Sequence, residues 1–172
     1  MRKIFPLVLF AAVGSFAHAD MKDYFPEAKL QSSDVSRLNV GAGITMKLAH
    51  VNAEWVNPYG IAYAKVGAFI NDDHEVGGQV GFRYPVILTG TDKNGYYLGA
   101  YAGSLKSKRF DDSDHVQYGG GVDLSYVLLN KERISTFSVG IGAGSELSDR
   151  DGSVIEETRP QIQFAYTLSV GF

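Results

Sequence analysis

Two histidines with acidic neighbours are the first residues in this chain that could do chemistry. His74 lies in the acidic run 72–75, and His115 follows Ser113 and Asp114. A serine hydrolase needs a histidine to take the serine proton and an acid to orient that histidine. Neighbours along a strand point to opposite faces, so Ser113, Asp114 and His115 cannot form such a triad on one strand. We interpret both histidines as residues at loop edges and predict that the chain is not an enzyme.

Acidic stretches are the next candidates, because clustered carboxylates can bind divalent cations. Residues 149–153 contain a fragment of a calcium-loop pattern, but the distal glutamate of the full motif is not at its place. Residues 111–114 form a second acidic cluster. Solvated loops with Asx turns explain both stretches, with loose cation binding as the alternative. We therefore predict no metal site and no cofactor.

A third set of charged residues is spread over several segments that otherwise alternate between apolar and small residues. If those segments are strands of one barrel, these charges share its inner face, together with glutamine and tyrosine side chains. Buried charges must be paired, and the set holds three residues of each sign, which predicts ion pairs across the interior. The charged set is Lys47, Glu54, Lys65, Glu75, Arg83 and Asp123.

The elements that must position these side chains are β-strands. Between Gln161 and Phe172, large apolar residues occupy every second position, and small or polar residues stand between them. The same alternation recurs over 38–47, 75–84, 116–128 and 137–144. A period of two is typical of strands, so the sequence predicts an all-β fold.

The size of the side chains on each face indicates which solvent surrounds the sheet. Here one face is large and apolar, and the other is rich in glycine with scattered charges. The interior of a narrow barrel has little room, so inward side chains are often small. Membrane barrels place apolar residues outside and polar residues inside. This pattern predicts a membrane barrel, and a soluble periplasmic barrel is the alternative.

Turn residues divide the alternating region into eight strands. Compact turns are expected at 57–60, 92–95 and 130–132, and more acidic connections at 71–73, 106–114 and 146–157, the last two of which are the longest. We therefore predict an eight-stranded antiparallel up-and-down transmembrane β-barrel over residues 37–172, with its compact turns in the periplasm. No residue between Thr45 and Asn52 is typical of a turn, which leaves the register of the first hairpin open. The expected strands are 37–46, 48–56, 60–70, 74–88, 95–107, 114–129, 132–146 and 157–172.

Aromatic residues gather near the expected periplasmic strand ends, where membrane barrels carry an interfacial girdle. They are Trp55, Tyr59, Tyr84, Tyr96, Tyr97, Tyr126 and Phe172.

The beginning of the chain predicts export. A basic start, an apolar run from Ile4 to Phe16 and the sequence Ala17-His18-Ala19 are typical of a cleaved signal peptide over residues 1–19. Residues 20–36 are expected to form a polar lead-in to the barrel, with a short helical turn around 26–30. Without Arg2 and Lys3, the 16 basic residues become 14 against 19 acidic ones, a net charge of −5. This balance argues against nucleic acid as a partner.

The final strand carries a fully apolar face, formed by Phe164, Tyr166, Leu168, Val170 and Phe172. By this strand and by its architecture, the chain resembles small eight-stranded bacterial outer-membrane proteins such as the OmpA barrel domain, OmpX and the neisserial surface protein. It is more faintly similar to YfaZ-type proteins. The resemblance implies that the barrel assembly machinery recognises the last strand as its assembly signal. It also implies a place in the cell outer membrane, in contact with outer-membrane lipid and lipopolysaccharide.

These features predict a monomeric outer-membrane barrel with a structural or surface-interaction role. A narrow channel or a lipid-binding barrel is the alternative. A lipid-modifying enzyme is less favoured, because the chain lacks the His-x-Ser pair that lipid A deacylases carry near the C-terminus.

Overall fold

The computed structural model describes residues 28, 30, 35–70, 75–89, 93–110, 113–148, 154–156 and 158–172. The predicted signal peptide (1–19), most of the lead-in (20–36) with most of its expected helical turn, His74, residues 111–112 and the acidic stretch 149–153 lie outside these residues. Side chains are described for fewer positions, so the side chains of Ser113, Asp114 and His115 lie outside them as well.

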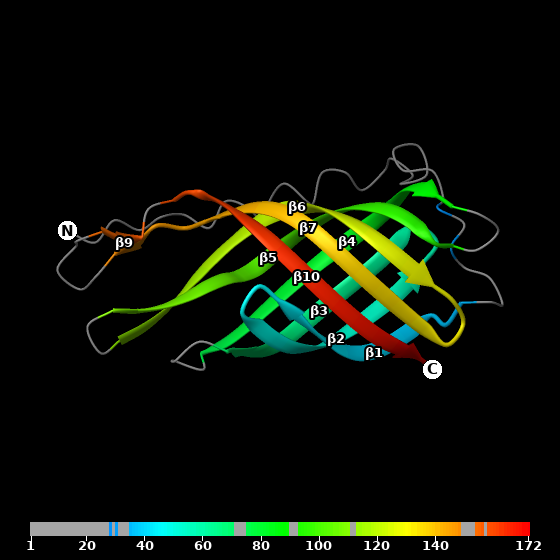
Figure 1. Cartoon of the computed structure of the whole chain (residues 1–172), viewed down its shortest axis with the longest axis horizontal. Helices are drawn as coiled ribbons and strands as arrows, with labels where there is room; N and C mark the ends of the chain where they lie inside the picture. The colour runs from blue at the N-terminus through cyan, green and yellow to red at the C-terminus, as the bar shows by residue number, and fades with distance from the viewer. Residues whose placement is uncertain are drawn as a thin grey trace, which may run out of the picture.

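Eight antiparallel strands close into a single barrel (Figure 1), which confirms the predicted fold class. Each strand pairs with its neighbours in sequence, and the first strand, β1, closes the barrel against the last, β10. The barrel strands are β1 (Leu38–Thr45), β2 (Leu48–Asn57), β3 (Gly60–Phe69), β4 (Val76–Leu88), β5 (Gly95–Phe110), β6 (Ser113–Leu129), β7 (Arg133–Gly144) and β10 (Pro160–Gly171).

Two short strands were not predicted. β8 (Leu147–Ser148) and β9 (Val154–Glu156) form a separate two-stranded hairpin within the connection expected to be a loop over 146–157. β5 also runs to Phe110, beyond the predicted end at residue 107. Together with the start of β6, it makes a hairpin that projects past the other barrel strands (Figure 1).

The two ends of the barrel differ in their connections. We call the end with the C-terminus and the connections 57–60, 89–94 and 130–132 the short-turn end, and the opposite end the long-loop end. Asparagine explains the compact turns, because its side chain accepts backbone hydrogen bonds in place of a neighbouring strand. Oδ1 of Asn57 accepts from Tyr59 N at 2.9 Å, and Oδ1 of Asn130 accepts from Arg133 N at 2.9 Å. Oδ1 of Asn94 accepts from Leu129 N, on β6, at 2.7 Å.

The first hairpin turns through two residues, Met46 and Lys47, because Thr45 pairs directly with Leu48. Met46 has a φ of 50°, in the left-handed region that suits glycine and costs other residues about 1–2 kcal/mol. The backbone N of Met46 donates to the carbonyl of Phe164 at 2.8 Å, which joins this turn to β10. Methionine thus occupies a turn position that glycine would normally take. For this reason the sequence contains no typical turn residue at this hairpin.

Replacing Met46 with glycine is therefore expected to stabilise the barrel. Glycine adopts a positive φ without the Cβ clash, so Met46→Gly should raise the free energy of unfolding by about 0.5–1 kcal/mol. Urea unfolding followed by the fluorescence of Trp55, the single tryptophan, would measure the change. Met46→Ala is the matched control, because it removes the same side chain while keeping the strain. A glycine variant no more stable than the alanine variant would contradict the strain.

The outer face of the barrel is apolar and the inner face is polar. On β6, Val122 and Leu124 are exposed, whereas Asp123 and Ser125, which alternate with them, are buried. On β10, the apolar side chains of the final strand point outward, with Phe172 81% exposed and Phe164, Tyr166, Leu168 and Val170 about half exposed. Because successive side chains on a strand alternate between faces, this arrangement extends around the barrel wall.

At the short-turn end, a cluster of buried apolar side chains fills the barrel. Leu30 and Val35, which precede β1, pack there against side chains of β2, β3, β5, β6 and β7. This region was expected to be only a polar lead-in, and that expectation is corrected for these two residues. We call the cluster the apolar plug: Leu30, Val35, Val56, Ile61, Tyr97, Val127, Leu129 and Ile134.

Hydrogen bonds to backbone carbonyl groups hold the segment before β1 against the plug. Ala28 N donates to Pro58 O at 2.8 Å, and Val56 N donates to Arg37 O at 2.8 Å. Ser36 Oγ donates to Lys131 O at 2.8 Å. Tyr97 lies inside the plug with its hydroxyl donating to Lys93 O at 2.7 Å. The sequence placed it both on the inner face and in the outward girdle, and the structure agrees with the inner face.

Leu30 is fully buried in the plug, so its truncation is expected to destabilise the barrel. Leu30→Ala should lower the free energy of unfolding by about 2 kcal/mol, the low end for buried leucines, because a segment at the barrel end can shift to fill space. Denaturant unfolding would measure this loss. Leu38→Ala, at a leucine that is 51% exposed on the outer face, serves as control. An effect below that of Leu38→Ala would contradict a role for Leu30 in the plug.

Candidate functional site

Arg83 is the centre of the polar interior. It extends from β4 and is 1% exposed. Its Nη1 lies 3.5 Å from Oε1 of Glu54 on β2, and its Nε lies 3.6 Å from Oδ2 of Asp123 on β6. The guanidinium therefore joins carboxylates from two sides of the barrel, as the sequence predicted for these three residues.

Two neutral side chains complete the surroundings of Arg83. Ser125 Oγ accepts from Arg83 Nε at 3.1 Å and donates to Asp123 Oδ2 at 3.1 Å, so it links the two charged groups. The ring of Tyr63 lies 4.1 Å from Cζ of Arg83, centroid to atom. Stacking on an aromatic face suits a guanidinium, which is more weakly hydrated than an ammonium group.

Lys65 is the second buried cation, one layer nearer the long-loop end. Its Nζ donates to Thr45 Oγ1 at 3.1 Å and lies 5.0 Å from the Tyr63 ring centroid. Thr45 Oγ1 also lies 3.1 Å from Nε2 of His50. Among the described residues, Glu54 and Asp123 thus balance Lys65 and Arg83 in the buried interior. Opposite charges in equal number keep the interior close to neutral, as burial requires.

Glycines on the inner wall make room for these large side chains. A Cβ at Gly99 would collide with the Asp123 carboxylate, and a Cβ at Gly81 would collide with the Tyr63 ring. The glycine-rich inner face predicted from the sequence is therefore the space into which the charged network and its tyrosine fit.

Amide side chains form the next layer toward the long-loop end. Gln79 Nε2 donates to Ser104 O at 2.8 Å and to Gln163 Oε1 at 3.2 Å. Gln161 Nε2 donates to Gln117 Oε1 at 2.5 Å, and Gln117 Nε2 donates to Ser145 O at 2.8 Å. Each amide both donates and accepts, so this layer links β4, β5, β6 and β10 with Ser145, the residue after β7.

Little free space remains between these layers. The hollow lined by Tyr63, Lys65, Gln79, Tyr101 and Asp123 has a volume of about 10 Å³. That is close to the smallest space that holds one water molecule. The apolar plug fills the barrel below this hollow.

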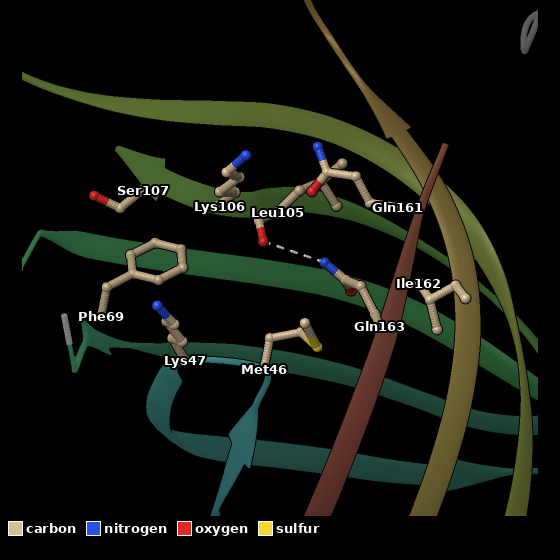
Figure 2. Close-up of a pocket in the computed structure, with 9 residues that line it drawn as sticks. All are labelled: Met46, Lys47, Phe69, Leu105, Lys106, Ser107, Gln161, Ile162 and Gln163. Carbon is tan, nitrogen blue, oxygen red and sulfur yellow. Dashed lines mark hydrogen bonds between the residues drawn. The ribbon is translucent and has the colours of Figure 1, made fainter. Parts of the chain in front are cut away.

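A larger cavity lies at the mouth of the barrel, at the long-loop end (Figure 2). Its volume is about 170 Å³. Gln163 lies in its wall, with its Nε2 donating to Leu105 O at 3.4 Å. We call this space the mouth cavity; its lining is Met46, Lys47, Phe69, Leu105, Lys106, Ser107, Gln161, Ile162 and Gln163.

Four of the six charged residues predicted for the interior lie there, and two do not. Glu54, Lys65, Arg83 and Asp123 are buried. Lys47 is exposed in the β1–β2 turn and lines the mouth cavity. Glu75 is half buried just before β4, and its carbonyl accepts from Phe69 N at 2.8 Å. The alternation that placed all six side chains inward stops at the strand ends, so it does not apply to these two residues.

Sequence reasoning missed Tyr63 and His50 as members of the interior. Both share strand parity with predicted inward residues, since Tyr63 lies two positions before Lys65 and His50 four positions before Glu54. The alternation of side chains along β2 and β3 could have placed both residues inside. They were not selected because tyrosine and histidine occur on either face of a barrel and carry no fixed charge.

Neither metal ligands nor a membrane-spanning helix is found in the described part of the chain. No three histidine, aspartate or glutamate side chains among the described residues are grouped to hold a metal ion. No described helix is long and apolar enough to cross a membrane.

Comparisons of the chain with family models, curated proteins and solved structures found no match, so the barrel and its interior are the basis for assigning a function.

Proposed function

We propose that this chain is a bacterial outer-membrane barrel with a filled interior and a structural or surface-interaction role in the envelope. One observation carries the proposal: large apolar side chains face outward around the wall, while charged and amide side chains are buried inside. Soluble monomers rarely expose contiguous apolar patches above a few hundred Å². An apolar outer face with a polar interior is favourable when hydrocarbon surrounds the barrel.

Aromatic residues at the short-turn end support the same proposal. Trp55 is 56% exposed on the outer face of β2. Tyr96 and Tyr126 are exposed on neighbouring strands, and their rings pack edge to face with centroids 5.1 Å apart. Amphipathic rings at one level of a barrel wall suit the boundary between lipid and water.

Two sequence features support the proposed location and partners. The signal-peptide pattern over residues 1–19 would direct the chain across the inner membrane. The outward apolar side chains of β10, ending in Phe172, would be the signal read by the barrel assembly machinery. The inserted barrel would contact outer-membrane lipid and lipopolysaccharide, with its long-loop end outside and its short-turn end in the periplasm.

The proposal is tested by purifying the full chain from membranes and from the soluble fraction. We expect recovery only with detergent, and different gel migration before and after boiling, because a folded barrel resists detergent until it is heated. A chain that purifies without detergent as a soluble monomer would overturn the proposal and favour a soluble periplasmic barrel.

The interior favours a structural role over a channel. The Arg83 network, the amide layer and the apolar plug fill the barrel in series, and eight-stranded barrels are just wide enough for side chains to fill. We therefore expect no discrete conductance steps from the purified barrel in planar bilayers. Regular steps that disappear when the protein is omitted would contradict this prediction and support the narrow channel.

A further inference from the structure

The mouth cavity differs from the rest of the interior in being hollow. The space around Lys65 measures about 10 Å³, whereas the mouth cavity measures about 170 Å³. A buried cavity of roughly 150 Å³ is large enough to take up benzene. The mouth cavity therefore has room for an organic group of about six carbon atoms.

The walls of this cavity combine apolar and cationic side chains. Met46, Phe69 and Leu105 contribute apolar surface, and Figure 2 shows them on three different strands or turns around the space. Lys47 and Lys106 are also part of the lining, and none of the nine lining residues is acidic. A site with apolar walls and the ammonium group of Lys47 at its edge is complementary to a molecule with an apolar body and an anionic head.

The turn that carries Met46 is a second, independent observation at this cavity. Met46 holds a φ of 50°, where glycine would be free of strain, and its Sδ accepts from Phe164 N at 3.4 Å. Strained residues persist where the surrounding structure fixes them and are frequent at ligand sites. The strain places the methionine side chain and the adjacent Lys47 at the edge of the cavity.

We propose that the mouth cavity binds a small amphiphilic carboxylate, with an apolar body of about six carbon atoms among Met46, Phe69 and Leu105. Its carboxylate lies at the rim beside the ammonium group of Lys47. This binding site depends on the barrel fold alone, so it goes beyond the proposed structural role and does not require it.

Hexanoate is the probe, and the methyl group of Met46 is the reporter. The chain contains three methionines, so labelling with [13C-methyl]methionine gives few signals, and Met46→Leu identifies the one from Met46. Titration of hexanoate into the full chain in nonionic micelles should shift that signal saturably, with a Kd on the order of 1 mM. A parallel titration of hexanoate into micelles without protein measures the uptake of hexanoate by the micelle.

Charge and apolar body are tested separately. Hexanol, which lacks the charge, should bind at least about threefold more weakly, and acetate, which lacks the body, should leave the Met46 signal unchanged. Lys47→Gln should weaken hexanoate about threefold, and Lys47→Glu about tenfold. Lys131→Gln is the matched control, because Lys131 is an exposed turn lysine at the opposite end of the barrel, and it should change the Kd less than twofold.

Three results would overturn the proposal. The first is a Met46 shift that does not saturate and follows the uptake of hexanoate by micelles without protein, since micelle uptake would then explain it. The second is equal binding of hexanol and hexanoate together with no effect of Lys47→Glu, because the site would then not recognise a negative charge. The third is an equal response to acetate, because the site would then not recognise an apolar group. Every variant is checked by gel migration before and after heating, so that loss of the fold is seen directly.

Discussion

Replacing Arg83 with methionine is expected to lower the free energy of unfolding by about 3–5 kcal/mol. Arg83 is 1% exposed and is the ion-pair partner of two carboxylates that are themselves 1% and 5% exposed. Methionine fills similar space but leaves Glu54 and Asp123 without their cation in a closed interior. Removing one partner of a buried ion pair is strongly destabilising because the remaining charge has neither water nor a counterion. Urea unfolding of the barrel, followed by Trp55 fluorescence, measures the loss.

A compensating variant separates the ionic cause from a packing defect. The double variant Arg83→Met and Asp123→Asn leaves one buried carboxylate, Glu54, with one buried cation, Lys65, so it should recover at least half of the lost stability. Arg133→Met is the matched control at an exposed arginine at the start of β7, and it should change stability by less than about 0.5 kcal/mol. A loss below about 1 kcal/mol for Arg83→Met would mean that the three charges do not depend on one another.

The network around Arg83 was largely predictable because a strand has a fixed period. Once one residue of a strand is assigned to the inner face, every second residue follows it. Glu54, Arg83 and Asp123 lie well within β2, β4 and β6, where that parity applies without interruption. The number of barrel strands was predictable for another reason. Asparagine residues mark the compact turns that separate one alternating segment from the next.

The features that were missed lie where no period exists. Leu30 stands alone among polar residues before β1, so its burial in the apolar plug depends on tertiary contacts that the sequence pattern does not show. Met46 occupies a turn position that favours glycine, and its backbone bond to Phe164 on β10 holds it there. Because the turn was not recognised, Lys47 was placed in the interior rather than at the mouth cavity. The site proposed to bind a ligand is therefore the part of the interior least accessible to sequence reasoning.

Introducing a charge on the outer wall is the second change with a large expected effect. Val122 is 52% exposed and lies on β6 between Ala100 of β5 and Ile141 of β7. Its neighbour Asp123 belongs to the Arg83 network, so Val122 lies near the middle of the barrel wall. If lipid surrounds the wall, Val122→Arg should lower the free energy of unfolding in vesicles by about 2–4 kcal/mol, because the guanidinium must then lie in hydrocarbon. Guanidinium titration of the vesicle-inserted barrel measures this cost.

The same substitution distinguishes a membrane barrel from a soluble one, because its effect depends on what touches the outer face. In water, arginine at a half-exposed position away from the core changes stability by less than about 0.5 kcal/mol. Thr158→Arg is the control in lipid: Thr158 is exposed and lies outside the barrel strands, so it should tolerate the charge. Val122→Leu controls for the change in size, since it keeps the residue apolar. Equal stability of Val122→Arg and Thr158→Arg in vesicles would mean that lipid does not contact this wall, and the exposed apolar band would then need a protein partner to cover it.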